Sequence, residues 1–315
     1  MSESKKVWKI KGHGEPETEA ARKKYWATSK FWLSVGVIVG VISIVTALVL
    51  IFVNIDYGSV GEGGKKEFEN MRILLPLYIY PTAQDADDPE NAYRRAGRAI
   101  SSTGGRTDVV INPANGTDAT SPPNSDWVTG LGQLREEAGG SFALRNMYGY
   151  VFTTYGDRDI NTIKAEIDGY FLLWGSFIGS IFFDEVSNDA SKLAYYQEIV
   201  NYVRSKSAEA RVILNPGVNP IDSFADLAGP EVSIVTFENL SVLWPGTNPS
   251  AIQAASSMPR KWSALVINEP NRGAIRDILL KAKERKFGNV FVTNYTDYNQ
   301  LPDYFDTLVS LVASS

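Results

Sequence analysis

Two adjacent carboxylates follow a short apolar run near the middle of the chain. Ile181, Phe182 and Phe183 lead directly into Asp184 and Glu185. A run of this length, rich in aromatic and β-branched residues and preceded by glycine, predicts a buried strand. Burial of a carboxylate is costly unless the group is paired, hydrogen-bonded or used in chemistry. The pair is therefore a candidate for acid/base or nucleophilic catalysis, and the alternative is a strand end that emerges into solvent.

Other reactive side chains are scarce, which narrows the chemistry. The chain has no Cys, and its one His is His13. The residues after His13 therefore cannot form a Ser-His-Asp triad, a His general base or a His-ligated zinc site. Hydrolysis would fall to carboxylates, with support from Tyr, Lys or Arg. We expect no metal and no cofactor, and a metal-dependent deacetylase is disfavoured because its usual His ligands are absent.

From Ile73 onwards the sequence alternates short apolar strands with amphipathic helical patterns. The predicted strands are 73–80, 107–112, 148–154, 178–185, 211–215, 232–238, 263–268 and 289–294. The predicted helices are 90–100, 126–138, 160–174, 191–206, 221–228, 249–257, 273–287 and 302–312. Eight such units in about 240 residues predict an α/β fold, a (β/α)8 TIM barrel. A doubly wound open sheet is the alternative, but it would normally have a Gly-rich first turn, and residues 79–81 lack one.

The active site of such a barrel lies at the C-terminal ends of its strands. Glu238 ends the sixth predicted strand, two strands around from Asp184 and Glu185, so three carboxylates would ring one mouth. Glycoside hydrolysis needs such a set, with one carboxyl protonated and another ionised. Aromatic and polar residues near the strand ends would contact the sugar, although core packing is the alternative for each aromatic ring. The predicted substrate-binding residues are Tyr78, Tyr80, Asn112, Tyr155, Arg158, Asn215, Trp244, Asn268, Asn294 and Tyr295.

Six ordered motifs resemble one protein family. They are L-L-P-L-Y-I-Y-P at 74–81, V-V-I-N-P-A-N-G at 109–116, G-Y-V-F-T-T-Y-G-D-R at 149–158, I-F-F-D-E at 181–185, V-I-L-N-P-G at 212–217 and V-T-F-E at 235–238. Together they resemble spherulation-specific family 4, the spherulin-4-like proteins, over about residues 73–295. Characterised members form glycoside hydrolase family 135. The resemblance implies a (β/α)8 barrel that cleaves α-1,4-linked N-acetylgalactosamine in the polysaccharide galactosaminogalactan.

The resemblance also implies roles for the three acids. The family's Asp-Glu pair falls on Asp184 and Glu185, and its later Glu falls on Glu238. We expect Asp184 to act as nucleophile or stabiliser and Glu238 as acid/base, with Glu185 supporting them or exchanging roles. The assignment stays open because neighbours on a regular strand point to opposite faces. The loop at 115–117 departs from the family's usual N-P-x-x-G-P-G pattern, and we expect it to shape a sugar subsite.

Residues 31–53 contain no charged residue and consist mainly of Val, Ile and Leu. A helix of this length can cross a hydrocarbon core of about 30 Å. Residues 1–30 carry eight Lys or Arg against four Glu, whereas residues 54–315 carry 23 basic against 32 acidic residues, a net of −9. The positive-inside tendency predicts a single-pass type II membrane protein. Its parts would be a cytoplasmic tail at 1–30, a transmembrane signal anchor at 31–53, a flexible linker at 54–70 and an extracellular domain at 71–315.

The net charge and the N-glycosylation sequons bear on which molecules the protein is expected to bind and whether it is glycosylated. The acidic balance beyond the anchor suits a cationic, partly deacetylated polysaccharide, and we expect no nucleic-acid partner. The alternative to an enzyme is a cell-surface or encystment protein that binds glycan without cleaving it. N-glycosylation sequons occur at Asn115, Asn239 and Asn294. Asn239 and Asn294 fall at the predicted mouth, where a glycan would obstruct the site, so we expect both to be unmodified. The oligomeric state is left open.

Overall fold

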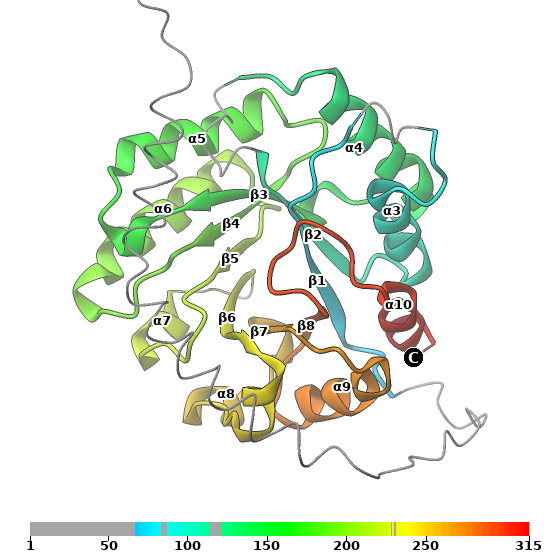
Figure 1. The fold of residues 1–315 in the computed structure, drawn as a ribbon. Helices are drawn as coiled ribbons and strands as arrows, with labels where there is room; N and C mark the ends of the chain where they lie inside the picture. The colour runs from blue at the N-terminus through cyan, green and yellow to red at the C-terminus, as the bar shows by residue number, and fades with distance from the viewer. Residues whose placement is uncertain (1–66, 83–86, 114–120, 228, 230, 315) are drawn as a thin grey trace, which may run out of the picture. The chain divides into compact units, whose positions relative to one another are not determined.

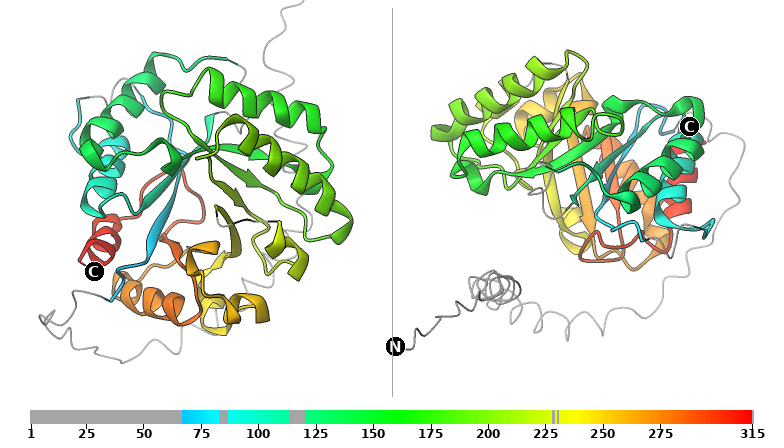
Figure 2. Two further views of the ribbon diagram at one scale, coloured as in Figure 1. Left: turned by 180° about the vertical axis from the view of Figure 1, so that it is seen from behind. Right: turned by 90° about the horizontal axis from the view of Figure 1, so that it is seen from above.

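The computed structural model describes residues 67–82, 87–113, 121–227, 229 and 231–314. Within these ranges, eight parallel strands close into a barrel in chain order, and the helices surround it (Figures 1 and 2). This arrangement confirms the predicted (β/α)8 TIM barrel and excludes the open sheet. The strands are β1 (Arg72–Leu77), β2 (Thr107–Ile111), β3 (Met147–Phe152), β4 (Ser180–Asp184), β5 (Val212–Leu214), β6 (Val232–Leu240), β7 (Trp262–Ile267) and β8 (Asn289–Val292).

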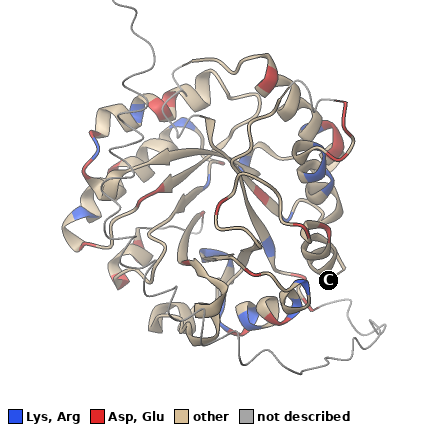
Figure 3. Ribbon diagram, in the orientation of Figure 1, with Lys and Arg blue, Asp and Glu red and all other residues tan. Residues whose placement is uncertain are grey.

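An α-helix follows each strand and packs on the outside of the barrel (Figure 1). The α-helices are α3 (Ala92–Ser102), α4 (Ser125–Ala138), α5 (Ile160–Leu172), α6 (Leu193–Lys206), α7 (Asp222–Asp226), α8 (Ala251–Ala255), α9 (Ile275–Glu284) and α10 (Phe305–Ala313). Short 3-10 helices occur at η3 (Gly139–Ser141), η4 (Leu144–Asn146), η5 (Thr154–Gly156), η6 (Ala190–Lys192), η7 (Ser241–Gly246), η8 (Pro259–Lys261) and η9 (Arg272–Ala274). Basic and acidic residues are interspersed over this outer layer (Figure 3).

Helices α3, α4 and α5 begin at side-chain caps. Asn91, Asn124 and Asp159 each accept hydrogen bonds from two backbone N–H groups of the first helical turn. The first turn of a helix leaves such N–H groups without a partner inside the helix. The caps therefore fix where these helices start after the loops at the mouth of the barrel.

Side chains alternate between the barrel interior and the helix layer. In the interior, the Tyr150 ring of β3 stacks on Phe182 of β4 with centroids 6.2 Å apart. On the other side of β3, Gly149 lies against the Tyr170 ring of α5, and a Cβ at this position would be 2.6 Å from ring carbons. Only glycine lets the helix approach so closely. The same alternation places Asp184, two residues after Phe182, on the interior side.

A β-bulge in β6 sets the direction of Glu238. Val235 pairs with one residue of β7 and Phe237 pairs with the next residue of β7, so Thr236 is an extra residue in the ladder. Thr236 donates a hydrogen bond to Gln253 of α8 at 2.9 Å, and Phe237 packs on an aromatic ring of η7 with centroids 5.0 Å apart. Two consecutive side chains therefore face the helices. Glu238, which follows them, returns to the barrel interior.

Strand ends differ from the prediction by a few residues. β1 ends at Leu77 and β8 at Val292, earlier than predicted, while β6 continues to Leu240. After β1 the chain leaves the ladder, because the carbonyl of Ile79 accepts a hydrogen bond from the Tyr93 hydroxyl at 2.6 Å instead of from a strand. The residues that follow these strands thus form the walls of the mouth.

The segments predicted at 1–30 and 31–53 lie outside the described residues, as does most of the linker predicted at 54–70. The last four linker residues are described and pack on the barrel domain. Phe68 is 2% exposed, and Glu67 pairs with an arginine of α9 at 2.9 Å. The folded domain thus includes residues that we predicted as linker. Across the described ranges, no helix combines the length and the apolar character that a membrane span requires.

Candidate active site

One amide nitrogen joins two carboxylates at the mouth of the barrel. Asn215, which follows β5, donates from Nδ2 to Asp184 Oδ1 at 2.7 Å and to Glu238 Oε2 at 2.6 Å. The amide nitrogen has two hydrogens, so each carboxylate can receive one. The two oxygens are separated by no more than these two bonds laid end to end, about 5.3 Å. Side chains at the ends of β4 and β6 therefore converge.

Three tyrosines surround the two acids. Tyr150 donates to Asp184 Oδ2 at 2.8 Å, and Tyr298 donates to Glu238 Oε1 at 2.7 Å. The Tyr78 ring lies between the other two, with its centroid 5.5 Å from each of them in an edge-to-face arrangement. Each carboxylate thus accepts one hydrogen bond from a phenol and one from the shared amide, and its orientation is fixed.

The surroundings raise the pKa of both carboxyls. Burial among protein atoms is the main cause at Asp184 and at Glu238, and the charge of Asp184 raises the pKa of Glu238 further. Hydrogen bonds from Tyr150, Tyr298 and Asn215 oppose the rise because they favour the ionised forms. Two acids this close titrate as a pair. Such a pair can supply one protonated and one ionised carboxyl, as acid/base chemistry needs.

Glu185 directly follows β4 in the left-handed region, with a φ of 50°. Its carbonyl accepts hydrogen bonds from the Thr153 hydroxyl and from the Tyr155 N–H, each at 2.7 Å. Burial and then the charge of Asp184 raise the pKa of the Glu185 carboxyl, while a hydrogen bond from the Thr154 N–H opposes the rise. Glu185 therefore lies beside Asp184 but outside the shared amide contact. In the described part of the chain, no three carboxylate or imidazole side chains are grouped as metal ligands would be.

Backbone strain is concentrated at the mouth. Five of the described non-glycine residues have positive φ, and Thr154, Tyr155, Glu185 and Asn268 are four of them. These four lie on the loops that follow β3, β4 and β7. The φ of Thr154 is 47°, which is costly for a β-branched residue. Strain of this kind collects at functional sites, where surrounding contacts hold it in place.

Three of the predicted substrate-binding residues lie at or close to the three acids, and a fourth, Asn112, follows another strand at the same end of the barrel. Tyr78 and Asn215 belong to the carboxylate cluster itself. Tyr155 follows β3 beside Glu185 and is 60% exposed, so much of its ring faces solvent. Asn112 follows β2, and its buried Oδ1 has no hydrogen-bond partner among the described residues. These positions are the best placed to contact a sugar.

Four others lie at the rim and contact neighbours rather than the three acids. The Tyr80 hydroxyl donates to an aspartate of α4 at 2.9 Å. The Tyr295 hydroxyl and the Asn294 amide donate to Asp303 at 2.7 and 3.2 Å. Asn268 is exposed next to them, and its N–H donates to the Tyr295 carbonyl at 2.8 Å. These residues could contact only the outer units of a long substrate.

The structure corrects one predicted substrate contact, Trp244, and places a second, Arg158, in an ion pair. Trp244 is 2% exposed and packs edge-on against Phe237, so no sugar can reach its ring. Arg158 forms an ion pair with Glu166 of α5, with one N–O distance of 2.8 Å, and its guanidinium covers the Phe152 ring. Trp244 is therefore not part of the site. Arg158 is held in the ion pair with Glu166, and its charge acts on the carboxyl of Glu185, where it lowers the pKa.

Two residues that the sequence did not single out orient the acids. Tyr150 follows Tyr148 at period-two spacing on β3, a pattern that places both on the same face of a strand. That signal was available in the sequence. Tyr298 lies in the loop after β8, where no periodicity indicates the direction of a side chain.

Comparison with known proteins identifies the family. The sequence profile of spherulation-specific family 4 matches residues 72–312. Spherulin-4 of Physarum polycephalum is 32% identical over 256 residues, which are 78% of this chain and 70% of that protein. The crystal structure of Aspergillus clavatus Sph3 in complex with GalNAc has a TM-score of 0.60 at 24% identity, over 77% of this chain and 97% of that chain. The chain therefore belongs to spherulation-specific family 4, the spherulin-4-like proteins, as its six motifs predicted.

Proposed function

We propose that the chain is an endo-acting glycoside hydrolase that cleaves α-1,4-linked N-acetylgalactosamine in a galactosaminogalactan-like polysaccharide. The observation that carries the proposal is the pair of acids, Asp184 and Glu238, joined through Asn215 at the mouth of the barrel. Two carboxyls at this spacing are the machinery of glycoside hydrolysis. The choice of sugar is supported by the fold that the chain shares with Sph3, whose crystal structure contains GalNAc.

The reaction would proceed by double displacement. The Asp184 carboxylate attacks the anomeric carbon, the bond from that carbon to the bridging oxygen breaks, and Glu238 gives its proton to this oxygen as it leaves. Water then attacks the anomeric carbon of the glycosyl ester while Glu238 takes up a proton from it. Asp184 leaves as a carboxylate, and both acids return to their starting states.

The assignment of roles follows the family resemblance, and charge coupling makes it chemically workable. Burial raises the pKa of both carboxyls, and a charge on one favours the protonated form of the other, so the pair can hold one proton; we assign that proton to Glu238 and the attack to Asp184, as the family resemblance implies. Retention at this linkage requires a nucleophile from the protein. In an α-linked N-acetylgalactosamine unit, the 2-acetamido group lies on the same face as the leaving oxygen and cannot displace it from behind. Glu185, beside Asp184, would bind a sugar hydroxyl and stabilise the developing positive charge.

We also propose that residues 31–53 anchor the protein as a single-pass type II membrane protein with the barrel outside the cell. The uncharged run and the basic residues before it support this proposal. Release of the full chain from membranes by alkaline carbonate would contradict the anchor.

Product analysis tests the proposed activity. The full chain is incubated with purified galactosaminogalactan, and the products are identified by mass spectrometry. We expect N-acetylgalactosamine oligosaccharides of several lengths, because an endo-acting enzyme cuts within the polymer. Chitin and a β-glucan serve as controls that should remain intact. Binding to galactosaminogalactan without release of oligosaccharides would contradict the hydrolase and support the glycan-binding alternative.

A further inference from the structure

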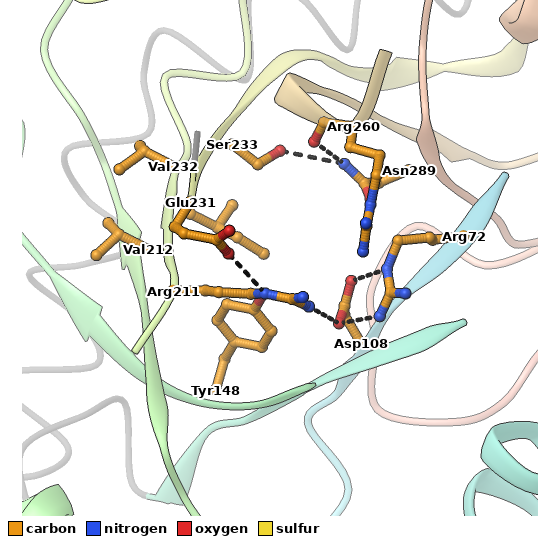
Figure 4. Close-up of a pocket in the computed structure, with 11 residues that line it drawn as sticks. Arg72, Asp108, Tyr148, Arg211, Val212, Glu231, Val232, Ser233, Arg260 and Asn289 are labelled. Carbon is orange, nitrogen blue, oxygen red and sulfur yellow. Dashed lines mark hydrogen bonds and ion pairs between the residues drawn. The ribbon is translucent and has the colours of Figure 1, made fainter. Parts of the chain in front are cut away.

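A cavity lined by three arginines lies at the floor of the barrel, where the strands begin (Figure 4). It contains about 460 Å³ of empty space, part of which is open to solvent. This is the end of the barrel opposite to the proposed active site. The charged and phenolic residues that line the cavity are Arg72, Asp108, Tyr148, Arg211, Glu231 and Arg260.

Two of the arginines are paired with the two acids. Arg72 is buried and donates to both carboxylate oxygens of Asp108, at 2.7 and 2.6 Å. Arg211 donates to Glu231 at 3.0 Å and lies 3.8 Å from Asp108. These contacts engage both carboxylates of the cavity with two of its three guanidiniums.

Arg260 supplies the third guanidinium; the residue is exposed to solvent and has no such ion-pair partner. Its side chain points into the cavity towards Arg72 and Asp108 (Figure 4), yet among the described residues no carboxylate forms an ion pair with it. Partial burial and then the charges of Arg72 and Arg211 lower the pKa of Arg260, while the charges of Asp108 and Glu231 oppose this fall. The cavity therefore has three positive and two negative groups. This local excess is opposite in sign to the net of −9 over residues 54–315, which have 23 basic and 32 acidic residues.

We propose that this cavity binds a small tetrahedral oxyanion of the phosphate class. Guanidinium groups recognise such ions through paired, charge-assisted hydrogen bonds. The ion would accept hydrogen bonds from Arg260 and from a neighbouring guanidinium, and the Tyr148 hydroxyl is a further donor at the cavity wall. A guanidinium without an ion-pair partner, directed into a cavity that two further guanidiniums line, is the observation that indicates a ligand.

The oxyanion site and the proposed active site are separate. Arg72 begins β1 at the floor, whereas Tyr78, beside the catalytic acids, follows the same strand at the mouth. An ion at the floor would therefore not compete with a sugar for space. Anion binding can accordingly be tested without substrate, and the proposal does not depend on the hydrolase activity.

Thermal unfolding of the full chain in phosphate, sulfate or chloride at equal ionic strength tests the site. We expect phosphate and sulfate to raise Tm in a saturable way and chloride to have no such effect, because a ligand of the folded state stabilises it. Arg260→Gln should weaken phosphate binding at least about tenfold, measured by calorimetric titration. Without phosphate this variant should be at least as stable as the wild type, because the substitution relieves repulsion among the guanidiniums. Arg145→Gln, which changes an exposed arginine paired with Glu209 at 3.5 Å, is the control and should respond like the wild type.

Two results would overturn the proposal. One is a wild-type Tm in phosphate that does not exceed the Tm in chloride. The other is a phosphate affinity that Arg260→Gln leaves unchanged, since the bound ion would then lie elsewhere. Binding of phosphate and sulfate with loss in Arg260→Gln and retention in Arg145→Gln would establish the site.

Discussion

Asp184 and Glu238 accept hydrogen bonds from the same nitrogen, Nδ2 of Asn215, although they belong to different strands. Closure of the barrel explains this contact. β5 lies between β4 and β6, so the residue that ends β5 is placed between the ends of its two neighbours. The shared donor and the short separation make the two acids one titrating unit. A change at one acid should therefore be measurable at the other.

The two phenols should act on different limbs of the pH–rate profile. Tyr150→Phe removes a donor that favours ionised Asp184, so the Asp184 pKa rises and the acidic limb moves to higher pH. Tyr298→Phe raises the pKa of Glu238 in the same way, and the basic limb moves to higher pH because Glu238 must be protonated. Each variant should lose about tenfold in kcat/KM at the optimum. Because the acids are coupled, each variant can also move the other limb slightly, but the same limb moving most in both variants would contradict the assigned roles.

Glu238→Gln should stabilise the fold. Because the folded protein raises the pKa of Glu238, it binds this proton more tightly than the unfolded chain does. The free energy of unfolding therefore falls as pH rises from the ordinary carboxyl pKa through the raised one. Glutamine brings no charge into the site, and the Tyr298 hydroxyl can rotate to accept from its amide. Melting curves should show a higher Tm than the wild type at pH 7 and a smaller difference near pH 4. Each kcal/mol gained in the free energy of unfolding should raise Tm by about 2–4 °C.

The matched control for this stability prediction is Glu269→Gln. Glu269 follows β7 at the same end of the barrel, and its carboxylate accepts a hydrogen bond from the Asn271 N–H at 2.9 Å. We expect no gain in Tm for this variant. A Tm of Glu238→Gln below that of the wild type at pH 7 would show that the Glu238 carboxylate stabilises the fold, contrary to the prediction.

Most of the fold could be predicted from the sequence, because hydrophobic periodicity records burial. Each strand from β1 to β8 begins within two residues of its predicted start, and the family motifs fall on the strand ends. The predicted C-terminal ends of the strands were less accurate where a side chain binds the backbone outside the sheet, as the Tyr93 hydroxyl does at the Ile79 carbonyl. Such contacts join residues that are distant in the sequence, and periodicity does not register them.

The site could be predicted in part only. Asp184, Glu238 and Asn215 were identifiable as polar residues at strand ends. The orientation of the Glu238 side chain could not be predicted. Strict alternation from Val235 would turn this side chain outward, and only the bulge at Thr236 turns it inward. Trp244 was predicted at the mouth from its position after β6, but η7 folds its ring back into the core. Such turns have no hydrophobic periodicity from which the direction of a side chain could be predicted.

Arg158→Met should destabilise the barrel instead of weakening substrate binding alone. The substitution leaves Glu166 in a buried position without its partner, and burial already raises the pKa of Glu166 while Arg158 lowers it. Loss of one member of a buried pair costs about 3–5 kcal/mol. Urea unfolding should show this loss, and the double variant Arg158→Met with Glu166→Gln should recover much of it. An increased KM with unchanged stability would show that Arg158 serves the substrate site and not the stability of the barrel.

The spacing of the two acids predicts the stereochemistry of cleavage. Asp184 Oδ1 and Glu238 Oε2 are no more than about 5.3 Å apart, the sum of their bonds to Asn215. Carboxyl groups of retaining glycosidases are about 5–5.5 Å apart. Proton NMR in the first minutes of the reaction should therefore show new reducing ends as the α-anomer. An initial β-anomer would require a water between the acids and would exclude Asp184 as the nucleophile.

The most direct test of the account compares cleavage of galactosaminogalactan by the wild type, Asp184→Asn, Glu238→Gln and Glu269→Gln. Release of oligosaccharides should fall at least about 1,000-fold in the first two variants, since each loses a group that acts in the transition state. Glu269→Gln should cleave at the wild-type rate, and all four proteins should sediment with the insoluble polymer. Cleavage by Asp184→Asn or Glu238→Gln within about tenfold of the wild-type rate would contradict the claim that these two acids carry the reaction.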